Sequence, residues 1–356
     1  MLIIDGHLDM AFNALFNRRD LTQPVDILRG REDLLVPRSA HPFNSPGTVT
    51  VSLPEMRRGH VGIMLSTIMS RIGVPGPRAH NAVRTQAAAY ARGQSHLAYY
   101  RALERVGEIT CITTIDELDA CVTAWQDPTP KTPIGLILTM ESADSILGPD
   151  CVQEWWDVGL RSVCLTHFGA NTYGHGTGSV GGLYSLAYPL MDAFQDVGIA
   201  IDLSHAADLT FWQILDYWDG PVHASHCTCR ALVPGQRHLS DDMITAITER
   251  GGVIGMAFAE AWLNPQWNWD DPKTHTATAT RSMKAVAEHV DHICQLTGNC
   301  DHVAFGTDLD GGFGREIAPT DCNSIADLQK FLDILKQQGY TSEDITKIAH
   351  ENLLRF

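Results

Sequence analysis

The residues of this 356-residue chain that could do chemistry follow short apolar runs, at the point where each run ends. The first case is the N-terminal stretch, in which His7 and Asp9 come after the apolar residues 2–4 and Gly6. In an extended chain the side chains of residues i and i+2 point to the same side. An imidazole and a carboxylate are thus presented together, which is half of a metal site. Further residues of this kind follow later apolar runs: Glu141, His167, His205, His226 and Asp308.

Together these positions supply four imidazoles and three carboxylates. That set is too large for one closed structural zinc site, and it suits two divalent metals bridged by a carboxylate and a hydroxide. Two nearby cations would also offset the repulsion among clustered carboxylates, which otherwise raises their pKa values. The mixture of imidazole and carboxylate ligands favours zinc, although manganese or iron would tolerate it.

Each of these residues has a simpler explanation when it is taken alone. A single histidine after a strand is more often hydrogen-bonded in the core or at its rim than bound to a metal. Asp308 and Asp310 are compatible with a calcium-like loop or with an ordinary turn. Cys227 and Cys229 are either metal ligands or small buried thiols. The position that the residues share, at the ends of strands, is what favours one common site.

Such a site needs a scaffold that brings strand ends together, and the hydrophobic pattern predicts one. Eight short apolar runs are typical of buried strands and cover residues 2–4, 61–69, 134–140, 162–166, 199–203, 221–225, 252–258 and 303–307. Helical patterns lie over 11–19, 81–106, 115–125, 155–159, 186–197, 209–218, 241–250, 280–296, 324–338 and 345–354. This alternation predicts an α/β fold of the (β/α)8 (TIM) barrel type, with its active site at the carboxyl ends of the strands.

The alternative architecture is an open doubly wound sheet, but no G-x-G-x-x-G fingerprint follows an early strand. Neither an internal repeat nor a linker divides the chain, so residues 1–356 are expected to form a single barrel domain. Residues 29–48 are predicted to be a long loop that acts as a flap over the site. The glycine-rich segment 169–182 is predicted to be a mobile or closely packed loop.

Composition and charge exclude several classes of partner. The formal net charge is −16 and the isoelectric point is about 5.3. Nucleic acid and anionic membrane surfaces are therefore not expected partners, because both are bound by basic faces. No apolar run reaches the length of a membrane span and no signal peptide is evident, so a cytoplasmic location is expected. The nine cysteines are scattered, which favours reduced thiols over a disulfide framework.

Several segments of the sequence, taken together, resemble the membrane dipeptidase (renal dipeptidase) family of zinc-dependent peptidases, which have amidohydrolase-like barrels. The matching segments are IIDGHLDM at 3–10, LTHFGAN at 165–171, IDLSH at 201–205, SHCTCRALVPGQRHLSDDMI at 225–244 and FGTDLDG at 305–311. The resemblance extends over almost the whole chain. Each of these patterns would be weak evidence alone, but their combination is specific.

The resemblance implies a binuclear site with two Zn²⁺ ions. His7, Asp9 and Glu141 are similar to the ligands of one zinc ion, with Glu141 and a hydroxide bridging to the second ion. His205 and His226 match the residues that complete the second site. The bridging hydroxide is the expected nucleophile, because two cations lower its pKa.

The resemblance also implies roles in binding and in proton transfer. His167 is similar to a histidine that faces the substrate beside the scissile carbonyl. Arg237 matches an arginine that binds the terminal carboxylate of the substrate, a bidentate pairing that would limit substrates to short peptides. Asp308 corresponds to the acidic residue that moves the proton from the hydroxide to the leaving amine.

The chain departs from the pattern of the family at three places. Residues 139–144 lack the glycine-rich sequence that often follows the bridging glutamate. Ala259 stands where family members often have a tyrosine, which affects the expected shape of the carboxylate pocket. Residues 349–355 lack the glycine pair that usually precedes Asn352.

The leading hypothesis is a dinuclear zinc dipeptidase that cleaves dipeptides with a free C-terminal carboxylate, including those with a D-residue at the C-terminal position. The first alternative is a related metal-dependent amidohydrolase that acts on N-acyl amino acids or lactams. The second is a metal-dependent binding protein without catalysis, which would have no need of a proton-transferring Asp308. A homodimer would suit a barrel hydrolase, although no segment of the sequence marks an interface.

Overall fold

The computed structural model describes residues 1–35, 47–73, 82–268 and 279–356. Eight parallel strands form a closed ring in the order β1, β2, β4, β5, β6, β7, β8 and β9. Their bounds are β1 Ile3–Leu8, β2 Val61–Met69, β4 Ile134–Glu141, β5 Leu160–Cys164, β6 Ala200–Asp202, β7 Val222–Cys227, β8 Ile254–Met256 and β9 Val303–Phe305. All eight coincide with or overlap the predicted apolar runs, so the prediction of a (β/α)8 barrel is confirmed.

A ninth strand, β3 (Ile109–Cys111), was not predicted. It pairs with the first residues of β4, while β5 pairs with the later residues of β4 on the same side. Only one of its three residues is buried, so it has no continuous apolar run by which the sequence could reveal it.

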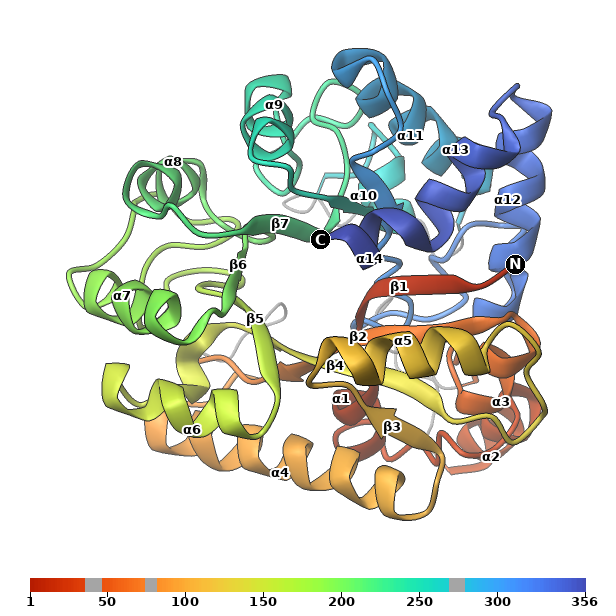
Figure 1. Ribbon diagram of the computed structural model, residues 1–356, viewed down its shortest axis with the longest axis horizontal. Helices are drawn as coiled ribbons and strands as arrows, with labels where there is room; N and C mark the ends of the chain where they lie inside the picture. Colours follow the sequence, from red (N-terminus) through yellow and green to blue (C-terminus); the bar gives the residue numbers. More distant parts are fainter. Residues whose placement is uncertain (36–46, 74–81, 269–278) are drawn as a thin grey trace.

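Helices surround the ring of strands, as Figure 1 shows. They are α1 Met10–Leu15, α2 Val25–Leu35, α3 Leu53–Arg58, α4 Gln86–Arg105, α5 Ile115–Ala124, α6 Val152–Asp157, α7 Ala187–Val197, α8 Asp208–Tyr217, α9 Asp241–Glu249, α10 Glu260–Leu263, α11 Met283–Thr297, α12 Leu328–Gln337, α13 Ser342–Thr346 and α14 Asn352–Arg355. Among the described residues, no helix has both the length and the apolar character needed to cross a bilayer.

The predicted loop at 29–48 is wrong for its first part, because α2 continues to its residue 35. Tertiary contacts explain the helix: the guanidinium of Arg29 donates hydrogen bonds to the carbonyl of Val49 at 2.6 and 2.9 Å. Val25 and Leu28, three residues apart, are also buried on one face of the helix, whereas Gly30 and the charged residues around it made residues 29–35 resemble a loop. Residues 36–46, which the prediction of a flap includes, lie outside the described part of the chain.

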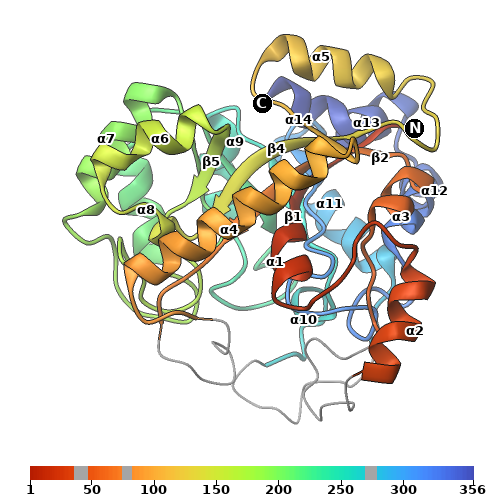
Figure 2. The ribbon, with the colours of Figure 1, turned by 90° about the horizontal axis from the view of Figure 1, so that it is seen from below.

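The chain termini lie at one end of the barrel, and the carboxyl ends of the strands lie at the other. In Figure 2 the two chain termini lie at one end, and α1 and α10, which follow β1 and β8, lie toward the other. The second end, where the carboxyl ends of the strands meet, is called the mouth below. Along β2 and β4 the register is continuous and ends with Met69 beside Glu141, which places the carboxylate of Glu141 at the mouth. That residues 1–356 form a single domain stays a prediction.

Candidate metal centre

The residues predicted to share a site all lie at the mouth of the barrel and are buried. Glu141 is the last residue of β4, and His7 and His226 lie near the ends of β1 and β7. His167 and His205 follow β5 and β6 by three residues each. The barrel therefore converts positions that are far apart in the sequence into one cluster, as parallel strands require.

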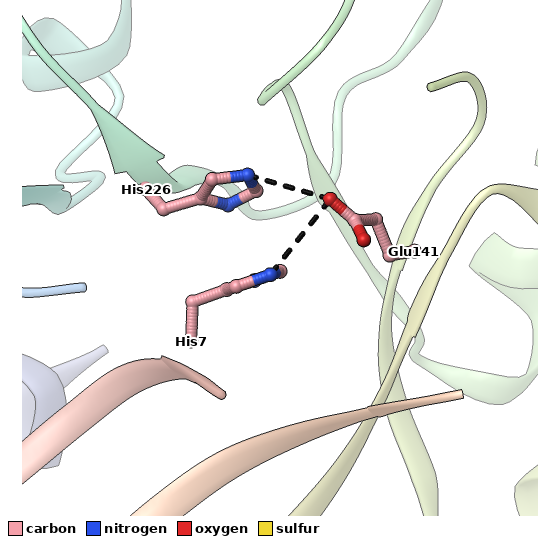
Figure 3. A group of neighbouring side chains, drawn as sticks. All are labelled: His7, Glu141 and His226. Carbon is pink, nitrogen blue, oxygen red and sulfur yellow. Dashed lines mark ion pairs between the residues drawn. The ribbon is translucent and has the colours of Figure 1, made fainter. Parts of the chain in front are cut away.

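One carboxylate oxygen lies at the centre of this cluster. Oε1 of Glu141 is 3.3 Å from Nε2 of His167, 3.3 Å from Nε2 of His205, 3.4 Å from Nε2 of His226 and 3.8 Å from Nε2 of His7. Figure 3 shows the imidazoles of His7, from β1, and of His226, from β7, directed at this oxygen. Four imidazole nitrogens thus converge on a single acceptor.

Two further carboxylates extend the cluster beside His7. The donor atoms of His7, Asp9 and Asp308 all lie within 4.8 Å of one another, and Nε2 of His7 is 3.9 Å from Oδ1 of Asp308. The same 4.8 Å limit holds for His7, Glu141 and His226 and for Glu141, His167 and His205. Glu141 and His7 therefore each belong to two overlapping groups, and each group has the donor atoms to hold a metal ion.

The ionisation of the carboxylates reflects their crowding. Burial raises the pKa of Asp9 well above its ordinary value, and the negative charge of Glu141 raises it further. Burial also raises the pKa of Asp308 well above its ordinary value, and the charges of Asp9 and Glu141 raise it further. Burial also opposes ionisation of Glu141, but the imidazoles around it outweigh burial and hold its pKa well below the ordinary value. A cation bound here would relieve the repulsion among the three charges.

The imidazoles are held in the neutral form that binds metals. Burial lowers the pKa of His226 to about 3, and it lowers the pKa of His205 well below its ordinary value. The nearby charge of Arg237 adds to both shifts. Nε2 of His7 is buried and has no hydrogen-bond partner in the described structure. Neutral rings, one unsatisfied nitrogen and adjacent carboxylates fit a metal site.

Backbone strain accompanies two of these residues. His205 has φ 63° and Asp308 has φ 54°, which lie in the left-handed region that non-glycine residues rarely occupy. Thr177 contacts both the backbone and the side chain of His205. Its backbone N–H donates to the carbonyl of His205 at 2.8 Å, and its Oγ1 lies 3.2 Å from Nδ1 of the ring. Such conformations persist only where the surrounding structure fixes them, and they concentrate at functional sites.

Arg237 lies beside the imidazole cluster. Its Nη2 donates to the carbonyl of His226 at 2.8 Å, and its Nη1 donates to Sγ of Cys227 at 3.4 Å. The guanidinium lies over the ring of Trp262, at 5.2 Å from the ring centre. Its Nε is buried and has no partner among the described residues, so one N–H group remains available to a ligand. Ala259, where family members often have a tyrosine, is fully buried.

The structure adds a residue that the sequence analysis did not single out. Arg71, two residues beyond β2, is 4% exposed and donates from Nη1 to the carbonyl of Phe168 at 3.1 Å. Its positive charge helps to lower the pKa of His167. The sequence could have identified Arg71, because it follows a predicted strand, as the other candidate residues do.

Other predicted features of the mouth are structural. Asp310 lies in a turn in which the backbone N–H of Gly311 donates to the carbonyl of Asp308 at 2.8 Å. The carboxylate of Asp310 accepts hydrogen bonds from the backbone N–H groups of Thr50 and Val51. All nine cysteines are free, and none belongs to the described metal-capable groups. The glycine-rich loop packs closely against the site, since a Cβ on Gly176 would lie 1.7 Å from the carbonyl oxygen of His167.

Comparison with protein families gives a match over the full chain. The family described as membrane dipeptidase (peptidase family M19) matches residues 1–356. A curated protein of unknown role from the pqqA 5′ region of Klebsiella pneumoniae is 28% identical over 212 residues, which are 57% of this chain and 73% of that protein. An uncharacterized dipeptidase of Schizosaccharomyces pombe is 26% identical over 230 residues, 62% of this chain and 52% of the yeast protein.

Solved structures confirm the fold. A metallopeptidase of family M19 named dipeptidase AC superposes with a TM-score of 0.79 at 22% identity, covering 100% of this chain and 97% of that one. A metallopeptidase of Rhodobacter sphaeroides, liganded with a phosphinate mimic of the dipeptide L-Ala-D-Ala, gives a TM-score of 0.78 at 23% identity. That comparison covers 100% of this chain and 98% of the other.

Proposed function

The chain belongs to the membrane dipeptidase family of metallopeptidases, and from this membership we propose that it hydrolyses dipeptides that carry a free C-terminal carboxylate, with two zinc ions in its active site. The observation that carries the proposal is the convergence of four imidazole Nε2 atoms on Oε1 of Glu141. A cluster of this composition, buried at the mouth of a barrel, is suited to a pair of metals and a small polar substrate.

Five residues would hold the metals. His7, Asp9 and Glu141 form one set, and Glu141, His205 and His226 form the other, with Glu141 common to both. The neutral state of the imidazoles and the unsatisfied Nε2 of His7 support these assignments. When bound, the two cations lower the pKa of a water molecule and polarise the scissile carbonyl.

His167 and Asp308 take parts other than metal binding in this proposal. Nδ1 of His167 is buried and has no partner in the described structure, whereas Nδ1 of His205 lies beside a hydroxyl group. A ring that is not held on its second nitrogen suits contact with substrate better than service as a fixed ligand. Asp308 accepts the proton of the attacking water and gives it to the leaving amine, a role that suits a carboxylate whose Oδ1 lies 3.9 Å from Nε2 of His7 at the edge of the cluster.

Arg237 binds the C-terminal carboxylate of the substrate. Its charge is buried and one of its N–H groups is unpaired, so a carboxylate would complete its hydrogen bonding. The metallopeptidase of Rhodobacter sphaeroides is liganded with a phosphinate mimic of L-Ala-D-Ala, a dipeptide with a D-residue at its C-terminal position. We therefore include dipeptides with a D-residue at the C-terminal position among the proposed substrates.

A panel of dipeptides tests the proposal directly. The panel contains L-L and L-D dipeptides, their C-terminal amides, N-acetyl amino acids and a lactam, and metal content is measured on the same protein. Turnover of free dipeptides with two zinc ions per chain supports the proposal. Faster hydrolysis of N-acyl amino acids or lactams would favour the related amidohydrolase instead. Zinc binding with no turnover of any compound would identify a binding protein.

A cytoplasmic location and a homodimeric assembly stay predictions from the sequence. Cell fractionation tests the first. Light scattering of the purified chain tests the second, since a monomer at micromolar concentration would contradict a stable dimer.

A further inference from the structure

One hydroxyl group lies between two of the clustered imidazoles. Oγ of Ser225 is 3.1 Å from Nδ1 of His7 and 2.8 Å from Nδ1 of His226. The two rings are tilted against each other, with their centres 3.7 Å apart and an angle of 31° between their planes. Their Nε2 atoms lie on the other side and face Glu141, as Figure 3 shows.

The number of protons on a hydroxyl group limits what this arrangement allows. A serine hydroxyl has one proton and two lone pairs, so it can donate to one ring nitrogen only, but it can accept from two. A neutral imidazole that offers a lone pair at Nε2 carries its proton on Nδ1. Both His7 and His226 therefore offer Nε2 to a metal only when both donate Nδ1–H to Ser225. The proton of Ser225 then turns to Oγ of Ser204, which is 3.4 Å away.

The backbone holds Ser225 firmly in this place. Its N–H group donates to Oδ1 of Asp202 at 2.9 Å. Its carbonyl oxygen is approached so closely by Gly255 and Gly306 that a Cβ on either would lie 1.9 or 1.7 Å from it. Ser225 is itself 4% exposed. Its hydroxyl is therefore a fixed acceptor and not a mobile surface group.

We propose that Ser225 is a positioning residue that holds His7 and His226 in the Nδ1–H tautomer and so prepares both metal sites at once. The inference rests on the proposed function for the assignment of His7 to one metal and His226 to the other. His205 receives its own hydroxyl from Thr177, at 3.2 Å from Nδ1. A change at Ser225 therefore affects ligands of both metals, whereas a change at Thr177 affects a ligand of one.

Zinc titration of the metal-free protein, with a competing chelator, tests this relation. Ser225→Ala should weaken binding of both zinc ions by about 10- to 100-fold, the usual cost of losing a group that orients a ligand. Ser225→Thr keeps the hydroxyl and should restore most of the affinity. Thr177→Val should weaken one ion only. Ser162→Ala is the matched control, because Oγ of Ser162 lies 2.6 Å from Nε2 of His223, a buried ring outside the described metal-capable groups.

Nitrogen NMR of protein with labelled histidines reports which ring nitrogen carries the proton. Loss of stability alone would not change this tautomer. In zinc-loaded wild-type protein both His7 and His226 should be protonated at Nδ1, and Ser225→Ala should lose the hydrogen-bonded Nδ1–H signal of both. Wild-type zinc affinity in Ser225→Ala, or an Nε2–H tautomer of either ring in the loaded wild type, would overturn the proposal.

Failure of the proposed function gives a different result. If the wild-type chain binds zinc but cleaves no dipeptide, the dipeptidase assignment fails. Zinc affinity and NMR still test whether Ser225 positions His7 and His226. In the metal-free wild type at least one of the two rings should carry Nδ1–H, because one hydroxyl donates to one ring only. Protonation of both rings at Nε2 would contradict the positioning role without any metal present.

Discussion

The Nε2 atoms of His205 and His226 lie 3.0 Å apart. Burial holds both rings neutral at physiological pH, because it lowers both pKa values well below 6.5. Both nitrogens also lie within 3.4 Å of the same oxygen of Glu141. Two neutral rings and a carboxylate at this spacing are suited to share a cation, and the proposed second metal site depends on this relation.

Glu141→Gln should abolish the proposed binuclear site. The substitution keeps the size of the side chain but removes the charge shared by both proposed metal sets. We expect loss of tightly bound zinc at both positions and a fall in kcat/KM of about 1000-fold or more, since metals supply several kcal/mol of transition-state stabilisation. Metal analysis and dipeptide turnover provide the measurement.

The matched control for this change is Glu55→Gln. Glu55 is also buried, at 7% exposure, but it accepts a hydrogen bond from Ser324 outside the cluster. It should retain zinc and turnover. Full zinc content in Glu141→Gln would rule out the bridging role.

Asp308→Asn should separate proton transfer from metal binding. Asparagine tolerates the left-handed backbone of this position, so the local fold should be kept. We expect kcat to fall by about 10²- to 10⁴-fold, the usual contribution of a general acid–base group, while zinc content is unchanged.

Asp310→Asn is the control for Asp308, because it has the same left-handed backbone in the same loop. Asp310 binds the backbone of Thr50 and Val51, so its substitution should lower the melting temperature more than it lowers kcat. Unchanged zinc content and unchanged turnover in Asp308→Asn would remove the proton-transfer assignment.

Arg237→Lys should weaken substrate binding selectively. Lysine keeps the charge but loses the planar fork that pairs with a carboxylate. KM for free dipeptides should rise by about 10- to 100-fold, in line with one lost charge-assisted hydrogen bond, and hydrolysis of dipeptide C-terminal amides should change little. Arg230→Lys provides the control, since Arg230 pairs with Asp208. An equal loss for dipeptides and for their amides would argue against recognition of the carboxylate.

The acid stability of the metal-free protein should depend on His96. Burial lowers the pKa of this residue to about 4 in the folded chain, against an ordinary value of 6.5. Between these values the unfolded chain binds a proton that the folded chain does not, so stability falls as pH decreases from about 6.5 to about 4. The full loss is about 3 kcal/mol.

His96→Gln should remove this part of the pH dependence. The amide can still accept the hydrogen bond that Nδ1 of His96 receives from the backbone N–H of Met69. Urea unfolding at pH 7 and pH 4 measures the difference between wild type and variant. If both lose stability equally over this range, His96 does not contribute.

The amino-acid sequence determined the strands of the barrel and the residues at their ends. Buried parallel strands are continuous apolar runs, so they could be located by composition alone. A residue that follows such a run, as Glu141 does, must lie at the mouth once the ring closes. The strand β3 and the helices α2, α3 and α10 were missed; β3, α3 and α10 are too short to show a repeated apolar pattern, and Gly30 and its charged neighbours obscure the pattern of α2.

Only the tertiary structure decided how the side chains meet. Ring closure through the pairing of β2 with β4 sets which strand ends are neighbours, and no pattern along the chain encodes that pairing. The hydroxyl of Ser225 contacts a ring 218 residues away, that of His7. Spacing along a strand fixes the face on which a side chain lies, but the partner across the barrel is chosen by packing. For this reason the candidate ligands were evident from the sequence, whereas the groups that orient them were not.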